Sequence, residues 1–419
     1  MSEATMTEHH RPETTDAVRA IIRDAVAART PLEVVGRGTK RGLGRPVQAA
    51  AVLDTTGLAG IALYEPDELV LQAGPGTPLA EIEALAAAHG QELAFEPADY
   101  GPLYGLPAGQ GTFGGAIGVN IAGPRRLSKG AARDHILGIT AVTGGGEVFK
   151  SGGRVVKNVT GYDLAKLLTG AHGTLGVLTS ITCKILPRPE TSTTIIVAGL
   201  DDARAAEAMS AAMGSPTEVS AAAHLPAPAA AGIAEVAGLG RAATCLRLEG
   251  IPVSVAERAD RLSKLLAPFG TVARLAEEPS KRLWTAIRDV RPFWPTAGAT
   301  EDTAPLLWRL SLAPMAGAVA VAAVRARLPG AEAFYDWQGG LVWLAVPADT
   351  PDAGAAIVRA AVRAAGGGHA TLVRAPAAVR ATVAVFEPQS AALAALSARV
   401  RQAFDPETIL NPGRMAASN

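Results

Sequence analysis

Residues 106–126 read LPAGQGTFGGAIGVNIAGPRR, a glycine-rich stretch. It contains six glycines, at positions 109, 111, 114, 115, 118 and 123. A glycine either permits a positive φ angle or removes a side chain, so that another group can touch the backbone. Six glycines in so short a stretch indicate the second role, with backbone N–H groups turned towards an oxygen-rich or planar ligand.

The alternative is a mobile loop, because glycine-rich composition alone is typical of flexible linkers. This stretch, however, contains the apolar β-branched residues Ile117, Val119 and Ile121, which linkers lack. It also belongs to a larger pattern of glycine-containing turns. We therefore expect it to contact a ligand.

The composition limits the classes of function. The 419 residues allow two or three domains. The formal net charge is +0, so nothing indicates a nucleic-acid-binding surface. The two cysteines, Cys183 and Cys245, lie far apart and form no Cys-x-x-Cys motif, so cysteines of this chain cannot hold an iron–sulfur cluster or a structural zinc ion.

No segment of the sequence predicts export or membrane insertion. The N-terminus, MSEATMTEHHRPETTD, has no apolar region of the kind that secretory signals carry. The longest apolar run, Met315 to Val324, is too short to span a bilayer. We expect a cytoplasmic protein without a transmembrane segment, whose association with a membrane would require a partner.

Two glycine turns flank the central stretch in the sequence. The predicted strand Leu32–Val35 runs into Gly36-Arg37-Gly38-Thr39-Lys40, which suggests a phosphate cradle made of backbone amides. Taken alone it could be an ordinary turn, because it is neither a Gly-x-Gly-x-x-Gly fingerprint nor a Walker loop. Further on, Gly173-Thr174-Leu175-Gly176 predicts a tight turn before a strand that starts at Val177.

From residue 191 onwards, Ala-rich helical segments alternate with short strands. The order of strands and helices spells βαββαβ twice, which is the ferredoxin-like unit. The segment 279–303 joins the two units and is expected to be irregular. A helix is predicted at Ala391–Phe404, followed by Asp405-Pro and Leu410-Asn411-Pro412-Gly413.

Together, the turns at 36–39 and 173–179 and the stretch 107–123 resemble, in order and spacing, the FAD-binding domain of the vanillyl-alcohol oxidase superfamily. The segment 405–413 looks like the tail that returns to the flavin in its D-2-hydroxyacid dehydrogenase branch. Within that branch, segments 157–164 and 307–314 resemble the FAD-binding second subunits of bacterial glycolate oxidases.

This resemblance implies an α+β fold. It consists of a two-subdomain FAD-binding domain of the p-cresol methylhydroxylase (PCMH) type over residues 12–190, a cap of ferredoxin-like repeats over 191–400, and a C-terminal segment, 401–419, that returns to the first domain. It also implies oxidation of glycolate, or of a similar small 2-hydroxy acid, within a complex. A sister flavoprotein subunit and an iron–sulfur subunit would complete that complex.

The resemblance assigns FAD contacts to all three glycine segments and to the tail. Residues 36–40 would hold the pyrophosphate, 112–120 would approach it and the ring, 173–177 would close over the adenine side, and Asn411 would reach the ribityl chain or the ring edge. Members of this fold family that attach the flavin covalently do so through His or Cys. Here Thr39 follows Gly38 and the central stretch has no Cys, so non-covalent FAD is expected. The expected cofactor-binding residues are Gly36, Arg37, Gly38, Thr39, Lys40, Thr112, Gly114, Gly115, Ile117, Gly118, Asn120, Gly130, Gly173, Thr174, Gly176, Val177 and Asn411.

Oxidation of a 2-hydroxy acid also needs a cation for the carboxylate and a base or metal for the hydroxyl proton. By resemblance, Arg288 and Arg309 lie where the branch places carboxylate-binding cations; each could equally be a surface arginine in a salt bridge. Arg125 and Arg126 could face the flavin or a partner. The region that would match the metal-binding histidines of the branch offers only His369, so no metal site is expected.

Three functions therefore stay open from the sequence. The chain could be an FAD-binding subunit that takes part in glycolate oxidation, or a flavin-bearing assembly subunit without turnover of its own. It could also be a stand-alone FAD-dependent oxidase of another small hydroxy acid. Because the sequence shows neither a metal site nor an obvious base, we expect the chain to oxidise little or no glycolate by itself.

Overall fold

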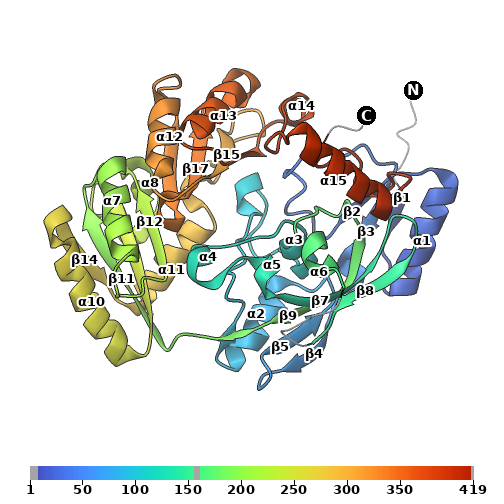
Figure 1. Ribbon diagram of the computed structural model, residues 1–419, viewed down its shortest axis with the longest axis horizontal. Coiled ribbons are helices and arrows are strands. Elements are labelled where there is room, and N and C mark those ends of the chain that lie inside the picture. Colours follow the sequence, from blue (N-terminus) through green and yellow to red (C-terminus); the bar gives the residue numbers. More distant parts are fainter. Residues whose placement is uncertain (1–7, 155–160, 417–419) are drawn as a thin grey trace.

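The computed structural model describes residues 8–154 and 161–416. The first four residues of the motif 157–164, including Lys157 and Asn158, lie outside the described residues. The chain forms two parts, at the lower right and at the upper left of Figure 1. We call the elements from β11 to β18 the cap, and residues 8–187 the N-terminal half. The last described residues, 405–416, return to the N-terminal half, where Asn411 and Arg414 form backbone hydrogen bonds with Leu32 and Arg45.

A small parallel sheet begins the N-terminal half. It has the order β1 (Glu8–His10), β3 (Ala51–Asp54), β2 (Leu32–Val35), and the sequence did not predict its edge strand β1. Helix α1 (Thr15–Ala28) starts at Thr14, whose side chain accepts a hydrogen bond from the amide of Ala17. Val18, Ile22 and Ala25 follow the helical period and are buried in the same cluster as the strands.

An antiparallel sheet of five strands completes this half, in the order β4-β5-β9-β7-β8. Short helices cover it and share one hydrophobic core with it, in which Phe113, Ile117 and Ile181 are fully buried. The strands are β4 (Ile61–Glu65), β5 (Val70–Ala73), β7 (Ile136–Val142), β8 (Val148–Gly152) and β9 (Val177–Lys184), with the small pair β6 (Gln91–Glu92) and β10 (Leu186–Pro187). The helices are α2 (Leu79–Ala88), α3 (Phe113–Gly118), α4 (Arg126–Lys129), α5 (Ala132–His135) and α6 (Leu164–Leu168).

The cap is built on one antiparallel sheet of eight strands, in the order β14-β11-β13-β12-β16-β17-β15-β18. Each half of it follows the order βαββαβ, which confirms the predicted ferredoxin-like repeats. The first half comprises β11 (Thr191–Ala198), α7 (Asp202–Met213), β12 (Ala221–Leu225), β13 (Ala243–Gly250), α10 (Pro252–Leu266) and β14 (Thr271–Leu275). The second comprises β15 (Leu306–Ser311), α12 (Ala316–Arg325), β16 (Glu332–Asp336), β17 (Leu341–Val346), α13 (Ala355–Ala364) and β18 (His369–Arg374).

The two halves of the cap meet where β12 pairs with β16, through His224 and Tyr335. Helices α8 (Ala227–Ala231) and α9 (Ala234–Ala237) follow β12, α14 (Ala377–Thr382) follows β18, and α15 (Ala391–Phe404) returns to the N-terminal half (Figure 1). The predicted boundary at residue 400 falls inside α15, and the domain boundaries stay a prediction.

One expectation for the cap was wrong. The segment 279–303 was expected to be irregular, but its first ten residues complete helix α11 (Glu277–Arg288). Leu283, Trp284 and Ile287 lie on one face of this helix and are buried. Pro279 occupies the first turn, where its missing N–H breaks no helical hydrogen bond, so it does not prevent the helix.

Buried charges join the cap to the N-terminal half. Arg125 Nη1 lies 2.6 Å from Glu92 Oε1, and Arg125 Nε lies 3.0 Å from Glu96 Oε1. From β13 of the cap, Arg247 Nη2 donates to the same Glu96 oxygen over 2.8 Å. Burial alone would raise the pKa of Glu96, but Arg247 and Arg125 outweigh it and hold this pKa at about 2.

We predict that Arg125→Met will strongly destabilise the protein, because it leaves buried carboxylates without their cation. Removal of one partner of a buried ion pair typically costs about 3–5 kcal/mol. Arg261→Met is the matched control, because Arg261 pairs with Glu257 on the surface, where such pairs contribute about 0–1 kcal/mol. Thermal unfolding measures both variants, and equal melting temperatures would contradict the structural role of the cluster.

Candidate functional site

A pocket lies in the N-terminal half, between the turn after β2, helix α3 and the turn before β9. A second hollow on the other side of the turn after β2 shares several residues with it, so the two form one groove that passes the turn. Twelve of the predicted cofactor residues line the pocket: Gly36, Arg37, Gly38, Thr39, Lys40, Thr112, Gly114, Gly115, Gly118, Gly173, Gly176 and Asn411. Segments far apart in the sequence are thus brought to one place.

Five predicted residues do not line this pocket. Ile117 and Val177 are fully buried in hydrophobic clusters. Thr174 donates its hydroxyl to the carbonyl of Ala171, Asn120 accepts the amide of Arg133, and Gly130 ends α4 at φ +84. Their described contacts hold the surrounding backbone in place.

The turn after β2 presents backbone donors. Within the described part of the chain, the amides of residues 37–40 donate no hydrogen bond. A Cβ atom on Gly36 would lie only 2.6 Å from Thr112 Oγ1, so glycine is needed for the turn to approach α3. Gly38 adopts φ +75, which glycine adopts without strain. Free amides in a tight turn suit an anionic group such as a phosphate.

The central glycine stretch differs from the expectation of a loop with free amides. Residues 113–118 form α3, which Thr112 caps by accepting the amide of Gly115 over 3.2 Å. The amides of Phe113 and Gly114 donate to the carbonyls of Thr77 and Pro75. Small side chains, and not free amides, are therefore what this stretch contributes to the pocket.

Individual glycines of α3 have separable roles. A Cβ on Gly114 would lie 2.6 Å from Pro75 Cβ, so this glycine permits close packing within the protein. A Cβ on Gly115 would lie 3.0 Å from Thr112 Oγ1 and would disturb the helix cap. Gly118 has no other group within 4 Å of an added Cβ and lines the pocket, so only a bound molecule would oppose a side chain there.

Lys40 supplies a cation to the pocket. No carboxylate lies within salt-bridge distance of its ammonium group in the described residues, and its nearest hydrogen-bond partner is Thr39 Oγ1 at 3.5 Å. Burial lowers the pKa of Lys40 to about 8, which the more distant Asp99 offsets only in part. A partly buried ammonium without a salt-bridge partner among the described residues fits an anionic ligand in the groove.

The C-terminal segment closes one side of the pocket, in a different way from that expected. Asn411 was expected to reach a flavin, but its Oδ1 accepts the amide of Val34 over 2.9 Å and its Nδ2 donates to the carbonyl of His172 over 2.8 Å. Arg414 donates to the carbonyl of Arg41 and to Glu33. The segment therefore fastens β2, the turn after it and the turn before β9 to one another.

Sequence reasoning missed Arg414 and assigned no role to His172, both of which line the pocket. The His172 ring packs edge-on against Phe386, with centroids 5.1 Å apart. Burial lowers the pKa of His172 to about 4, and Arg414 adds to the effect, so the ring is neutral near pH 7. The sequence signal for Arg414 was its position directly after Gly413, at the end of the segment expected to return to the flavin.

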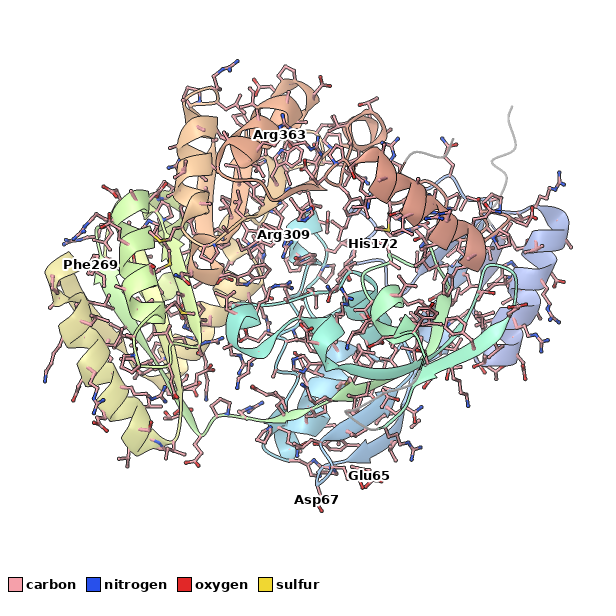
Figure 2. All side chains as sticks on the ribbon, viewed as in Figure 1. Glu65, Asp67, His172, Phe269, Arg309 and Arg363 are labelled. Carbon is pink, nitrogen blue, oxygen red and sulfur yellow. The ribbon has the colours of Figure 1, made fainter. Side chains whose placement is uncertain are left out.

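Arg288 and Arg309 have different partners in the structure, and their role in binding a carboxylate stays a prediction. Arg288 ends α11, and its Nε and Nη2 donate to both carboxylate oxygens of Asp289 over 2.8 and 2.9 Å. Burial alone would lower the pKa of Arg288, but Asp289 holds it above its usual range. Arg309 lies on β15, with its guanidinium carbon 5.0 Å from the Trp337 ring centroid (Figure 2).

The region that was compared with metal-binding histidines contains one histidine, His369. His369 starts β18 and is exposed. Among the described residues, no group of three His, Cys, Asp or Glu side chains is close enough to hold a metal ion. Cys183 and Cys245 are fully buried, and burial raises the pKa of each thiol to about 12. In the part of the chain that the structure describes, no helix has the length and apolar character needed to span a bilayer.

The chain is similar to known FAD-linked proteins. Residues 10–152 match the family described as an FAD binding domain. The chain is 36% identical over 402 residues to glycolate oxidase subunit GlcE of Escherichia coli K12, which covers 94% of this chain and 95% of that protein. It is 31% identical over 186 residues to glycolate oxidase subunit GlcD of Bacillus subtilis 168, over 44% of this chain and 38% of GlcD.

Among solved structures, p-cresol methylhydroxylase with bound substrate has a TM-score of 0.75. The match covers 98% of this chain and 88% of that one at 16% sequence identity, so it shows the fold alone. The predicted PCMH-type architecture is thereby confirmed. FAD is the cofactor that the matched domain and the relatives support, and the free amides, the small residues and Lys40 fit it.

We predict that Gly118→Val will weaken FAD binding at least about tenfold, or about 1.4 kcal/mol, because the new side chain enters the pocket. Gly238→Val is the matched control: Gly238 follows a helix, has ordinary φ, and has no group within 4 Å of an added Cβ. Flavin content and titration of the apo-protein measure the effect. Full FAD occupancy in Gly118→Val would contradict the assignment of the pocket.

We also predict that the affinity of the apo-protein for FAD falls as the pH rises above about 8. Below this value the Lys40 ammonium is charged and attracts the pyrophosphate; above it the free protein holds a neutral amine, and binding must take up a proton. Lys40→Met should bind FAD more weakly and lose this pH dependence. The titration is repeated between pH 6.5 and 9.5, and the same slope in both proteins would contradict the role of Lys40.

Proposed function

Because the chain belongs to the family of glycolate oxidase subunit GlcE, we propose that it is the FAD-binding subunit of a complex that oxidises glycolate or a similar 2-hydroxy acid. The acid would become the 2-oxo acid, and electrons would leave through an iron–sulfur partner subunit. The observation that carries the proposal is the single pocket formed by the separate glycine segments within a chain similar to GlcE over nearly its full length.

The residues of the pocket would divide the binding of FAD between them. The free amides of residues 37–40 and the Lys40 ammonium would neutralise the pyrophosphate. Gly115 and Gly118 would leave room for the flat rings of FAD. Asn411 and Arg414 would keep the surrounding turns in position. When bound, FAD supplies a hydride acceptor. We propose that it is held without a covalent bond, because Thr39 stands at the turn and both cysteines lie outside the pocket.

A metal ion would activate the substrate hydroxyl, but the described residues contain no cluster of side chains that would hold one. The described residues hold no metal-binding group, and the exposed His369 has no second histidine beside it. General-base help is typically worth about 10²–10⁴-fold in rate. We therefore propose that this subunit carries FAD and contributes little oxidation alone, while a sister flavoprotein subunit performs most of the chemistry. This observation also favours the second candidate, a flavin-bearing assembly subunit without turnover.

A partner subunit is supported by an exposed apolar surface. None of the residues of α15 is buried, although the helix reads AALAALSARVRQAF. Leu393 and Leu396 are each 48% exposed. Tyr162 precedes α6 by two residues and is 89% exposed. Leu393 and Leu396 lie one turn apart on a helix without buried residues, so α15 offers an apolar face that a partner would cover. The identity of the partners and a cytoplasmic location stay predictions.

We predict that the isolated, FAD-loaded protein bleaches slowly or not at all when it is mixed anaerobically with glycolate. The reason is the missing base and metal. Absorbance near the flavin maximum follows the reaction, and the assembled complex serves as the positive control. Acid treatment of the same sample should release all of the flavin from the polypeptide.

Rapid bleaching of the isolated chain would make it a stand-alone oxidase or a catalytic subunit. Flavin that stays with the denatured polypeptide would contradict non-covalent binding. If no partner subunit co-purifies from the native source, the assignment to a complex fails, while the FAD pocket remains.

A further inference from the structure

Asp336, the last residue of β16, carries a buried carboxyl group. Only 3% of its surface is exposed. Its Oδ1 accepts the amide of Trp337 over 2.7 Å, and within residues 8–154 and 161–416 no cation lies within salt-bridge distance of it. A buried carboxylate without a paired cation is costly, so such a group favours its protonated form.

The side chain of Asp336 lies on the face of the cap sheet that is turned towards the N-terminal half. Successive side chains of a strand lie on opposite faces. Phe334 belongs to the core that includes the N-terminal half, whereas Tyr335 packs with the helices on the other face. Asp336 therefore shares the face of Phe334, together with Leu341 and Trp343 of the neighbouring strand β17.

Three charged side chains face Asp336 from the surrounding elements. Glu96 belongs to the N-terminal half, Arg247 to β13 and Arg309 to β15, while β12 and β17 present apolar side chains on this face. Burial raises the pKa of Asp336 to about 7, and Glu96 adds to this effect. The amide of Trp337 and the two arginines oppose it. The group therefore changes its charge close to neutral pH.

The two arginines differ in whether they already have a partner. Arg247 is paired, because its Nη2 donates to Glu96 Oε1 over 2.8 Å. In the described part of the chain Arg309 forms no side-chain hydrogen bond and no salt bridge, and its guanidinium carbon lies 5.0 Å from the Trp337 ring centroid (Figure 2). Asp336 and Arg309 each shift the pKa of the other. Arg309 is therefore the cation that an ionised Asp336 can attract.

The Trp337 ring stays in place when Arg309 moves. Residues 337–339 all have left-handed φ angles, of 51°, 61° and 86°, which a bulky residue adopts only where its surroundings impose them. The ring is fixed across the junction, because its Nε1 donates to the carbonyl of Gly123 over 3.0 Å. The guanidinium carbon of Arg126 lies 4.9 Å from the ring centroid and remains there as a second cation.

We infer that Asp336 is a proton-operated switch for the position of Arg309. When Asp336 is protonated, Arg309 lies on the Trp337 ring and carries an unpaired charge. When Asp336 loses its proton, the carboxylate draws the guanidinium off the ring into an ion pair. The pH thereby sets whether the junction of cap and N-terminal half offers a free cation. The switch does not depend on the proposed function, because none of these three residues lines the FAD pocket.

Tryptophan fluorescence of the FAD-loaded protein, followed from about pH 5.5 to 8.5, tests the switch. The emission of the wild type and of Trp294→Phe should change in one step centred near pH 7, and Trp337→Phe should lack this step. Asp336→Asn should keep the low-pH emission throughout, because asparagine accepts the same amide but does not ionise. Asp352→Asn is the matched control: Asp352 also starts a turn of three left-handed residues, but it is exposed, so the step should remain.

Arg309→Met identifies the cation that moves. Without this partner, ionisation of Asp336 is less favourable, so any remaining step should shift to higher pH by about one unit or more. Arg291→Met is the matched control, because Arg291 lies over Trp294, 5.8 Å from the ring centroid, and should leave the midpoint unchanged.

Thermal unfolding gives an independent measure of the same proton. Because the pKa of Asp336 is raised in the folded protein, its contribution to stability is present at low pH and is lost as the pH rises through about 7. The melting temperature of the wild type, relative to that of Asp336→Asn, should therefore fall across this range.

A wild type without the step, a step that persists in Asp336→Asn, or an unchanged midpoint in Arg309→Met would each overturn the inference. Flavin content and near-UV circular dichroism check that the variants are folded, and if Asp336→Asn is not, Arg309→Met decides. These outcomes do not affect the proposed function. A protein that shows the step but carries no FAD contradicts the proposed function alone.

Discussion

The carboxylate of Glu96 is the contact on which the arrangement of the two parts depends. It lies in the N-terminal half, accepts the amide and faces the side chain of Arg125, and receives Arg247 from the cap. Two guanidinium groups around one buried carboxylate leave little freedom for the angle between cap and N-terminal half, because separating them would expose unpaired buried charge. This cluster therefore holds one end of the junction in place.

Two further contacts keep that angle over the rest of the junction. Arg374, on the last strand of the cap, donates to the carbonyls of Leu103 and Phe293. The Tyr104 hydroxyl donates to the carbonyl of Val373 over 2.8 Å. In each of these hydrogen bonds the acceptor is a backbone carbonyl, so the bond does not depend on which side chain the accepting residue carries. The Trp337 ring is thereby held at a fixed place.

Much of this could be predicted from the sequence, because the predictive signals were local. Glycines at 36, 38 and 173 mark turns, and alternation of strand and helix patterns gave the repeats of the cap. The predictions that failed depended on contacts between distant parts of the chain. The stretch expected to be a loop with free amides is the capped helix α3. The carbonyls of Pro75 and Thr77 lie at the start of this helix and accept its first amides. Those acceptors are more than thirty residues away, and no pattern within the stretch indicates them.

The same reasoning explains why the sequence alone does not distinguish the surroundings of the arginines. Arg288 looked available, but its own neighbour in the chain, Asp289, takes both of its donor edges. Arg126 looked like one of a pair with Arg125, yet one of the two is buried among carboxylates and the other is stacked on Trp337. Whether an arginine is neutralised depends on which side chains the fold brings to it, and this information is absent from its local sequence.

Binding a nucleotide cofactor and activating a hydroxyl group require different features of a protein. The first needs free amides, small residues and one cation, which the turn after β2, Gly118 and Lys40 provide. The second needs a base or a metal held at one atom of the substrate, and the described residues offer His369 only at an exposed strand end. A chain with the first set and without the second can hold an oxidised or reduced cofactor but has no means to start the reaction quickly. Such a chain would be useful beside a subunit that has both, and the proposed complex would supply that subunit.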